Sequence, residues 1–124
     1  MAVTYRRDLE RRLLVVTLAG LVTESDLERL TEQVRNDPSL DPTWGALVDA
    51  STLNPAGLTS ETLRSRAGIP RPRPVPIAIV APTDVVFGLA RMFQMMSEGQ
   101  GNRIEVFRYT GDALAWLTTG ERAE

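Results

Sequence analysis

The sequence predicts a single α/β domain with an N-terminal β-hairpin followed by four β–α turns. We expect a five-stranded, mostly parallel sheet with an antiparallel edge strand. Three observations lead to this prediction. The chain of 124 residues has the length of one domain. Two short apolar runs near the N-terminus are separated by only a few polar residues. Beyond them, apolar runs alternate with segments of helical spacing, which favours parallel strands joined by right-handed crossovers.

The hairpin is predicted from two different strand patterns. Residues 3–7 alternate between apolar and polar side chains, as a strand with one exposed face does. Asp8-Leu9-Glu10 is predicted to form the turn. Residues 13–19 are a continuous apolar run rich in β-branched side chains, and Gly20 follows them. Such a run is typical of a strand that is covered on both faces.

The helices are predicted from hydroxyl side chains followed closely by acidic residues. Thr23 and Thr59 can each cap a helix, and Thr83 or Asp84 can cap a third. Thr110 is expected to cap the last helix. The predicted helices end before residues 36–38, before Gly68, near residue 98 and at residue 117.

The remaining strands are predicted at residues 46–50, 77–81 and 104–108. Residues 51–58 and 99–102 are predicted as loop and turn. Four of the chain's 8 prolines lie in residues 69–76, which favours polyproline II or extended loop there. We therefore expect one domain over residues 1–117 and a polar C-terminal tail over residues 118–124.

The composition argues against catalysis. The chain contains no histidine and no cysteine, and all 14 of its basic residues are arginine. Histidine is the commonest general base and metal ligand, cysteine thiolate is a common nucleophile, and lysine forms Schiff bases. We therefore expect a protein that is not an enzyme, with no cofactor and no metal.

The charge and hydropathy predict a cytoplasmic protein. The formal net charge is −2, so the chain lacks the clustered positive charge that binds nucleic acid. No N-terminal targeting segment is recognisable. The longest apolar stretches, residues 13–19 and 75–82, are far shorter than the roughly 20 residues that span a bilayer. We expect no nucleic acid and no membrane insertion.

One candidate interaction or regulatory site follows from the predicted topology. Ligands of open parallel sheets favour the edge at which the strands' carboxyl ends meet. The polar residues expected at that edge are Asp49, Ser51, Thr52, Thr83 and Asp84. Helix capping and turn formation explain the same residues equally simply. Asp49 and Asp84 could also act as paired carboxylates, or bind Mg²⁺ together with Asn54.

A second candidate is an apolar contact face on the longest predicted helix. It contains Phe87, Met92, Met95 and Met96. Apolar side chains at so many positions exceed the single stripe that a surface helix needs. The helix could be a thickly covered core element, a homodimer face or the wall of an apolar ligand pocket. An arginine-rich stretch (Arg64, Arg66, Arg71, Arg73) lacks aromatic neighbours that would stack on bases, which favours a solvated linker.

Three local features of the chain resemble the STAS/SpoIIAA-like superfamily. Leu47-Val48-Asp49 ends the central predicted strand, a hydroxyl-rich loop at 51–58 leads into a helix, and residues 86–93 read V-F-G-L-A-R-M-F. The chain is most similar to small stand-alone bacterial members of unassigned function. Members of this superfamily include anti-sigma-factor antagonists that partner switch-protein kinases, and cytoplasmic domains of anion transporters. Related CRAL-TRIO-type folds bind lipids.

The resemblance also bears on regulation. The antagonists carry a phosphorylated serine at the start of the helix that follows the central strand. The matching stretch here is residues 54–57, which places Ala56 where that serine would lie. The superfamily's phosphoserine switch is therefore not expected at this position.

The sequence thus predicts a non-catalytic STAS-like interaction or regulatory module. Its expected partner is another protein or a second copy of the chain in a homodimer. The alternative is a small carrier that binds an apolar or lipid-like ligand, by analogy with the lipid-binding folds.

Overall fold

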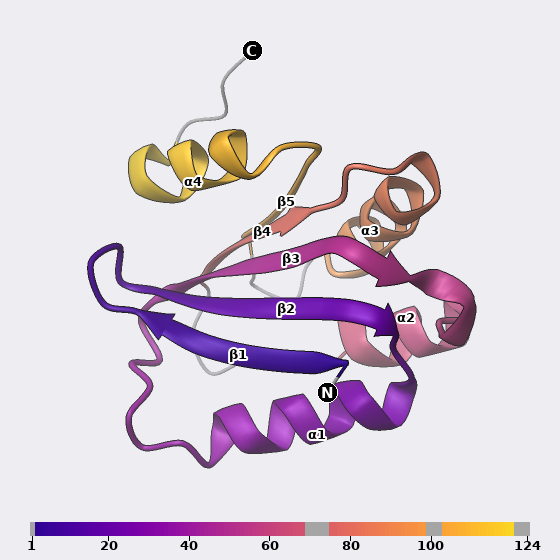
Figure 1. The fold of residues 1–124 in the computed structure, drawn as a ribbon, viewed down its shortest axis with the longest axis horizontal. Helices are drawn as coiled ribbons and strands as arrows, with labels where there is room; N and C mark the ends of the chain where they lie inside the picture. The colour runs from indigo at the N-terminus through magenta and orange to yellow at the C-terminus, as the bar shows by residue number, and fades with distance from the viewer. Residues whose placement is uncertain (1, 69–74, 99–102, 121–124) are drawn as a thin grey trace.

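The computed structural model describes residues 2–68, 75–98 and 103–120. The elements follow the predicted order of two strands and then alternating helices and strands (Figure 1). In chain order they are β1 (Val3–Asp8), β2 (Leu13–Leu21), α1 (Glu24–Arg35), β3 (Gly45–Asn54), the 3₁₀ turn η1 (Pro55–Gly57), α2 (Ser60–Ala67), β4 (Pro76–Val80), α3 (Asp84–Met96), β5 (Arg103–Phe107) and α4 (Thr110–Thr119).

The five strands lie side by side in the order of the chain, β1-β2-β3-β4-β5. β1 is antiparallel to β2, and every other neighbouring pair is parallel. One row across the sheet shows how the register places apolar side chains together: Val16 lies opposite Val48, Val48 opposite Ile79, and Ile79 opposite Val106. The predicted fold class is confirmed.

The helices cover the two faces of the sheet unequally. Val86 and Ala90 of α3 pack against Ile79, whereas Trp116 of α4 packs against Ala78. Neighbouring residues of a strand point to opposite faces, so α3 and α4 lie on opposite faces of β4. α1 joins the α3 layer through leucines that pack near Val16. Figure 1 shows α1 and α2 together on the side of the sheet away from α4.

The first helix begins as the sequence predicts. The Thr23 hydroxyl accepts a hydrogen bond from the Asp26 N–H at 3.3 Å, and the Asp26 carboxylate accepts one from the Thr23 N–H at 3.0 Å. These bonds form a reciprocal capping box. The bond from the Thr23 N–H lowers the pKa of Asp26 below its ordinary value, so the cap favours the ionised carboxylate. Thr59 also caps as predicted, since its hydroxyl accepts from the Thr62 N–H at 3.1 Å.

The two later helices begin differently. Thr83 is the N-cap of α3, but its side chain makes no capping hydrogen bond. The N-cap of α4 is Tyr109, so the prediction that Thr110 caps this helix is wrong. Thr110 is instead the first residue of α4, which runs to Thr119 and so extends into the segment predicted as a tail.

The prediction of a loop at residues 51–58 is wrong in its first half. β3 continues to Asn54 because, after a bulge, it keeps pairing with β2: Ala19 lies opposite Thr52, and Leu21 lies opposite Asn54. The rest of the segment forms η1 and its exit. The proline-rich residues 69–74, the predicted turn at 99–102 and the tail residues 121–124 lie outside the described residues.

Gly57 generates a stability prediction. A Cβ at Gly57 would lie 2.5 Å from the Val22 carbonyl oxygen, whereas one at Gly88 of α3 would meet nothing within 4 Å. We expect Gly57→Ala to lower the free energy of unfolding by about 1–3 kcal/mol, because the backbone must shift. We expect Gly88→Ala to raise it by about 0.5–1 kcal/mol, because alanine is the better helix former. Urea unfolding of both variants checks this pair, and equal midpoints would contradict it.

Candidate functional site

The carboxyl ends of the parallel strands bring part of the predicted site together. Asp49 is the last residue of β3 that pairs with β4, where it lies opposite Val80. Its Oδ1 accepts hydrogen bonds from both the N–H of Ser51, at 3.0 Å, and the Ser51 hydroxyl. The carboxylate is therefore turned along its own strand toward Ser51, just beyond the last residue that pairs with β4.

Asp84 lies in a different cluster at the same edge. Arg108, directly after β5, donates from Nη1 to Asp84 Oδ1 at 2.7 Å and to the Pro82 carbonyl at 3.1 Å. Its guanidinium carbon lies 4.1 Å from the centre of the Phe87 ring, within reach of a cation–π contact. Arg108 thus ties the end of β5 to the start of α3. The sequence prediction missed this residue.

The hydroxyls of Thr52 and Thr83 are not part of either cluster. Both residues are exposed, and among the described residues neither side chain makes a hydrogen bond. The predicted edge site is therefore one Asp49–Ser51 pair, one Asp84–Arg108 pair and two free hydroxyls. Such an edge can donate and accept hydrogen bonds to a partner.

The geometry does not favour paired-carboxylate chemistry. Each of the two aspartates has its own hydrogen-bond donor, and the Asp84 side chain is 93% exposed. Two carboxylates can share general acid–base catalysis when burial moves their pKa values apart. Within residues 2–68, 75–98 and 103–120, no three His, Cys, Asp or Glu side chains come together as a metal site.

The predicted apolar contact residues differ widely in exposure. Met95 is 60% exposed, whereas Met92 and Met96 are half-buried and Phe87 lies beneath the Arg108 guanidinium. Val85, which the prediction did not include, is 65% exposed. Helical spacing places a set of residues on one side of α3, away from the sheet. We call the α3 outer face the residues Val85, Gly88, Arg91, Met92 and Met95.

Two open pockets lie elsewhere. One, of about 250 Å³, lies between β1 and α1 and is lined by residues such as Val3, Arg29 and Leu30. The other, of about 320 Å³, lies at the amino ends of the parallel strands, where Gly45 and Pro76 line it. Neither pocket includes a methionine of α3. These two pockets therefore do not supply the methionine wall that the carrier alternative expects.

The arginine-rich stretch has a structural role in the part that is described. Arg66 of α2 donates to the Leu27 carbonyl at 3.3 Å and to the Thr31 hydroxyl, both on α1. These bonds hold α2 against α1. Arg64 is exposed, and Arg71 and Arg73 lie outside the described residues. The interpretation of this stretch as a solvated linker is thus incorrect for Arg66.

The position that the resemblance matches to a phosphoserine is at the surface. Ala56 is exposed, and its N–H donates to Asn54 Oδ1 at 3.1 Å. Asn54 thereby caps η1, which has Pro55 at its first position. The side chain at 56 is a methyl group, so this turn has no hydroxyl to modify at that residue.

Comparisons with known proteins bear on the fold. No protein-family model matches the chain, and no curated protein matches it either. Among solved structures it is similar to an uncharacterised protein of the DUF3478 family from Shewanella loihica PV-4, which has a SpoIIAA-like fold. The TM-score is 0.59 at 20% identity, over 94% of this chain and 92% of that one. The fold is SpoIIAA-like. This confirms the predicted resemblance at the level of fold, and the similar protein is itself of unknown function.

Over the described ranges, none of the helices is both long and apolar enough to cross a bilayer.

Arg108 generates the prediction for this site. We expect Arg108→Met to speed hydrogen exchange of the Phe87 amide, which donates to the Thr83 carbonyl oxygen at 2.8 Å, roughly fivefold, the equivalent of about 1 kcal/mol for an exposed ion pair. The matched control is Arg103→Met on β5, whose guanidinium lies 5.4 Å from the Trp116 ring instead. Unchanged exchange of the Phe87 amide in Arg108→Met, or equal acceleration in both variants, would contradict the assigned role.

Proposed function

We propose that this SpoIIAA-like protein is a non-catalytic interaction module that binds a protein partner through the α3 outer face and the adjoining carboxyl edge. The observation that carries the proposal is the exposure of large apolar side chains at this place. Val85 is 65% exposed and Met95 is 60% exposed on one side of one helix. Tyr109, directly after Arg108, is 71% exposed.

Exposing an apolar helix face to water costs free energy, and a partner that covers the face removes this cost. α3 already buries Val86 and Ala90 against the sheet, which satisfies its own need for packing. The apolar side chains on its outer side add nothing to that core. Contiguous exposed apolar surface marks interaction sites, and Met, Tyr and Arg are enriched where proteins meet. The α3 outer face contributes Met92, Met95 and Arg91, and Tyr109 lies at the adjoining edge.

The charges of the face define the chemistry of the partner. Arg91 is exposed and makes no hydrogen bond or ion pair to the described residues, whereas Asp84 already binds Arg108. The partner that fits offers apolar side chains together with a carboxylate for Arg91. An acidic amphipathic helix has this pattern, and Gly88 leaves room for its backbone to approach closely.

A second copy of the chain fits less well than a different protein. α3 has 13 residues, so it is roughly 20 Å long. Contact between two such helices alone falls short of the about 800 Å² per partner that stable complexes bury. A different protein can also cover the carboxyl edge, where the hydroxyls of Thr52 and Thr83 can bond to it.

The absence of catalysis is part of this proposal. The edge aspartates hold the ends of their own strand and helix, and neither has a histidine or lysine beside it, since the chain contains neither. A docking role depends on exposed side chains and requires no proton transfer.

The test compares how well the wild-type protein and variants substituted at exposed positions capture a partner. We expect Met95→Asp and Val85→Asp to weaken capture of a stoichiometric partner from native lysate at least tenfold, because each places a charge in the apolar face. We expect Asp49→Ala and Thr83→Ala to weaken it less, by loss of polar contacts at the edge. Quantitative mass spectrometry of the captured material gives the readout. Circular dichroism checks that each variant is folded.

The control is Leu9→Asp in the hairpin turn, where the wild-type leucine is 63% exposed. This variant should capture the partner as wild type does. Equal loss in Leu9→Asp, or full capture by Met95→Asp, would overturn the proposal. A solution mass of two chains that Met95→Asp reduces to one would replace the different protein with a second copy.

A further inference from the structure

We propose that the pocket at the amino ends of the parallel strands binds a small anion, a carboxylate or phosphate group carried on a flat apolar body. The pocket has a volume of about 320 Å³. Its walls come from the hairpin turn (Arg11, Arg12), the segment before β3 (Asp41, Trp44) and the end of α4 (Leu117). It lies at the end of the sheet opposite to the α3 start, so this inference is independent of the function proposed above.

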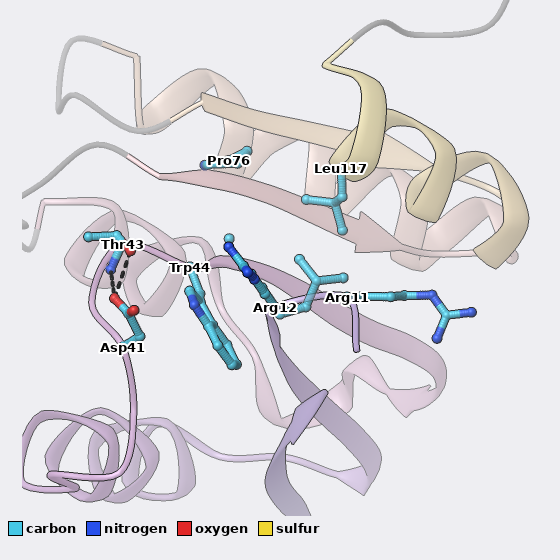
Figure 2. Close-up of a pocket in the computed structure, with 9 residues that line it drawn as sticks. Arg11, Arg12, Asp41, Thr43, Trp44, Pro76 and Leu117 are labelled. Carbon is cyan, nitrogen blue, oxygen red and sulfur yellow. Dashed lines mark hydrogen bonds between the residues drawn. The ribbon is translucent and has the colours of Figure 1, made fainter. Parts of the chain in front are cut away.

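The apolar part of the pocket is fixed by a tight approach of three elements. Gly45 and Pro76, the first residues of β3 and β4, both line it. A Cβ at Gly45 would lie 2.9 Å from the Pro76 carbonyl oxygen and 3.5 Å from Leu117 Cδ2. Only glycine lets β3 and β4 come this close, whereas the distance to Leu117 of α4 is an ordinary van der Waals contact. Figure 2 shows the Trp44 side chain between the Asp41–Thr43 pair and Arg12.

The two arginines of the turn differ in their partners. Arg11 forms an ion pair with Asp8, with Nη1 3.1 Å from Oδ2. In Figure 2 the Arg11 side chain extends away from Trp44. Arg12 makes no hydrogen bond or ion pair within the described ranges. The pocket is thus lined by one arginine without a partner and by an indole ring.

The acid in the pocket does not fill this role. Asp41 Oδ1 accepts hydrogen bonds from the Thr43 N–H at 2.8 Å and from the Thr43 hydroxyl at 2.7 Å. These bonds turn the carboxylate toward its own loop. The guanidinium N–H donors of Arg12 therefore have no bond to Asp41 and can bind an anion.

The backbone of Arg12 is a second, independent observation. Its φ is +57°, and among the described residues it is the only one other than glycine with a positive φ. This left-handed conformation is costly for a residue with a Cβ, and glycine would hold the turn without strain. Retained strain of this kind occurs at functional sites. An arginine at this position places its side chain at the pocket, although its backbone conformation is strained.

The chemistry of the ligand follows from these groups. A guanidinium donates two parallel N–H bonds to one carboxylate or phosphate group. Trp44, Pro76 and Leu117 supply the smaller, apolar part of the lining, which can contact a ring attached to that group. The volume is near the lower limit of about 300 Å³ for ligand pockets, which suits a compact aromatic anion.

The experiment uses the indole N–H signals of the two tryptophans in ¹⁵N-labelled protein. Trp44 lines the pocket, while Trp116 is only 4% exposed in the core and serves as the internal reference. We expect phenyl phosphate and benzoate to shift the Trp44 signal saturably and to leave Trp116 almost unchanged. Inorganic phosphate, which lacks the ring, and benzamide, which lacks the charge, should each bind at least tenfold more weakly. The tighter of phenyl phosphate and benzoate identifies the preferred anionic group.

Arg12→Gly is the decisive variant because glycine adopts the positive φ without strain. We expect it to be at least as stable as wild type and to bind phenyl phosphate about tenfold more weakly, as loss of a charge-assisted hydrogen bond implies. Arg6→Gln on β1, which removes a charge outside the pocket, should bind as wild type. No Trp44 shift with any anion, wild-type binding by Arg12→Gly, or equal loss in Arg6→Gln would overturn the proposal.

Discussion

The order of the strands is the constraint on which the rest of the structure depends. Because each parallel strand lies directly beside the previous one, every crossover moves in the same direction across the sheet. Crossovers of one hand then place α1, α2 and α3 on a single face. In the described part of the chain, the helix on the opposite face is α4, and its Trp116 packs among residues from β2 to β5. Burying this one indole connects the C-terminal helix to most of the sheet.

The same constraint explains why α3 has a free side. α3 is the last helix of its layer, so α2 is its one neighbouring helix in that layer. α1, which begins the same layer, turns charged and amide side chains such as Glu28 and Gln33 to solvent. α3 has the same kind of position but exposes Val85 and Met95. The contrast between two helices in one layer supports the proposal of a partner for α3, because solubility alone would favour polar side chains on the outer side of both helices.

Much of the fold could be predicted because its signals are local. Apolar periodicity gave the strand and helix order, and Thr23 with Asp26 gave the first cap. The errors occur where distant pairing decides. Residues 51–54 have loop-like composition, yet pairing with β2 makes them strand. Of the candidate site, Asp49 with Ser51 could be placed at the carboxyl edge, but Arg108 could not, since a cation after a strand has no local signature. The proposed anion pocket could not be predicted either, because Arg12 and Trp44 line one pocket only through tertiary structure.

The proposed docking along α3 is tested most directly by hydrogen-exchange mass spectrometry of the protein alone and with its captured partner bound. We expect slower exchange in the complex at the start and outer side of α3 and in the segment around residues 108–109. Exchange in the β1–β2 hairpin should be unchanged. Protection confined to that hairpin or to α1, with α3 exchanging as in the free protein, would contradict the claim.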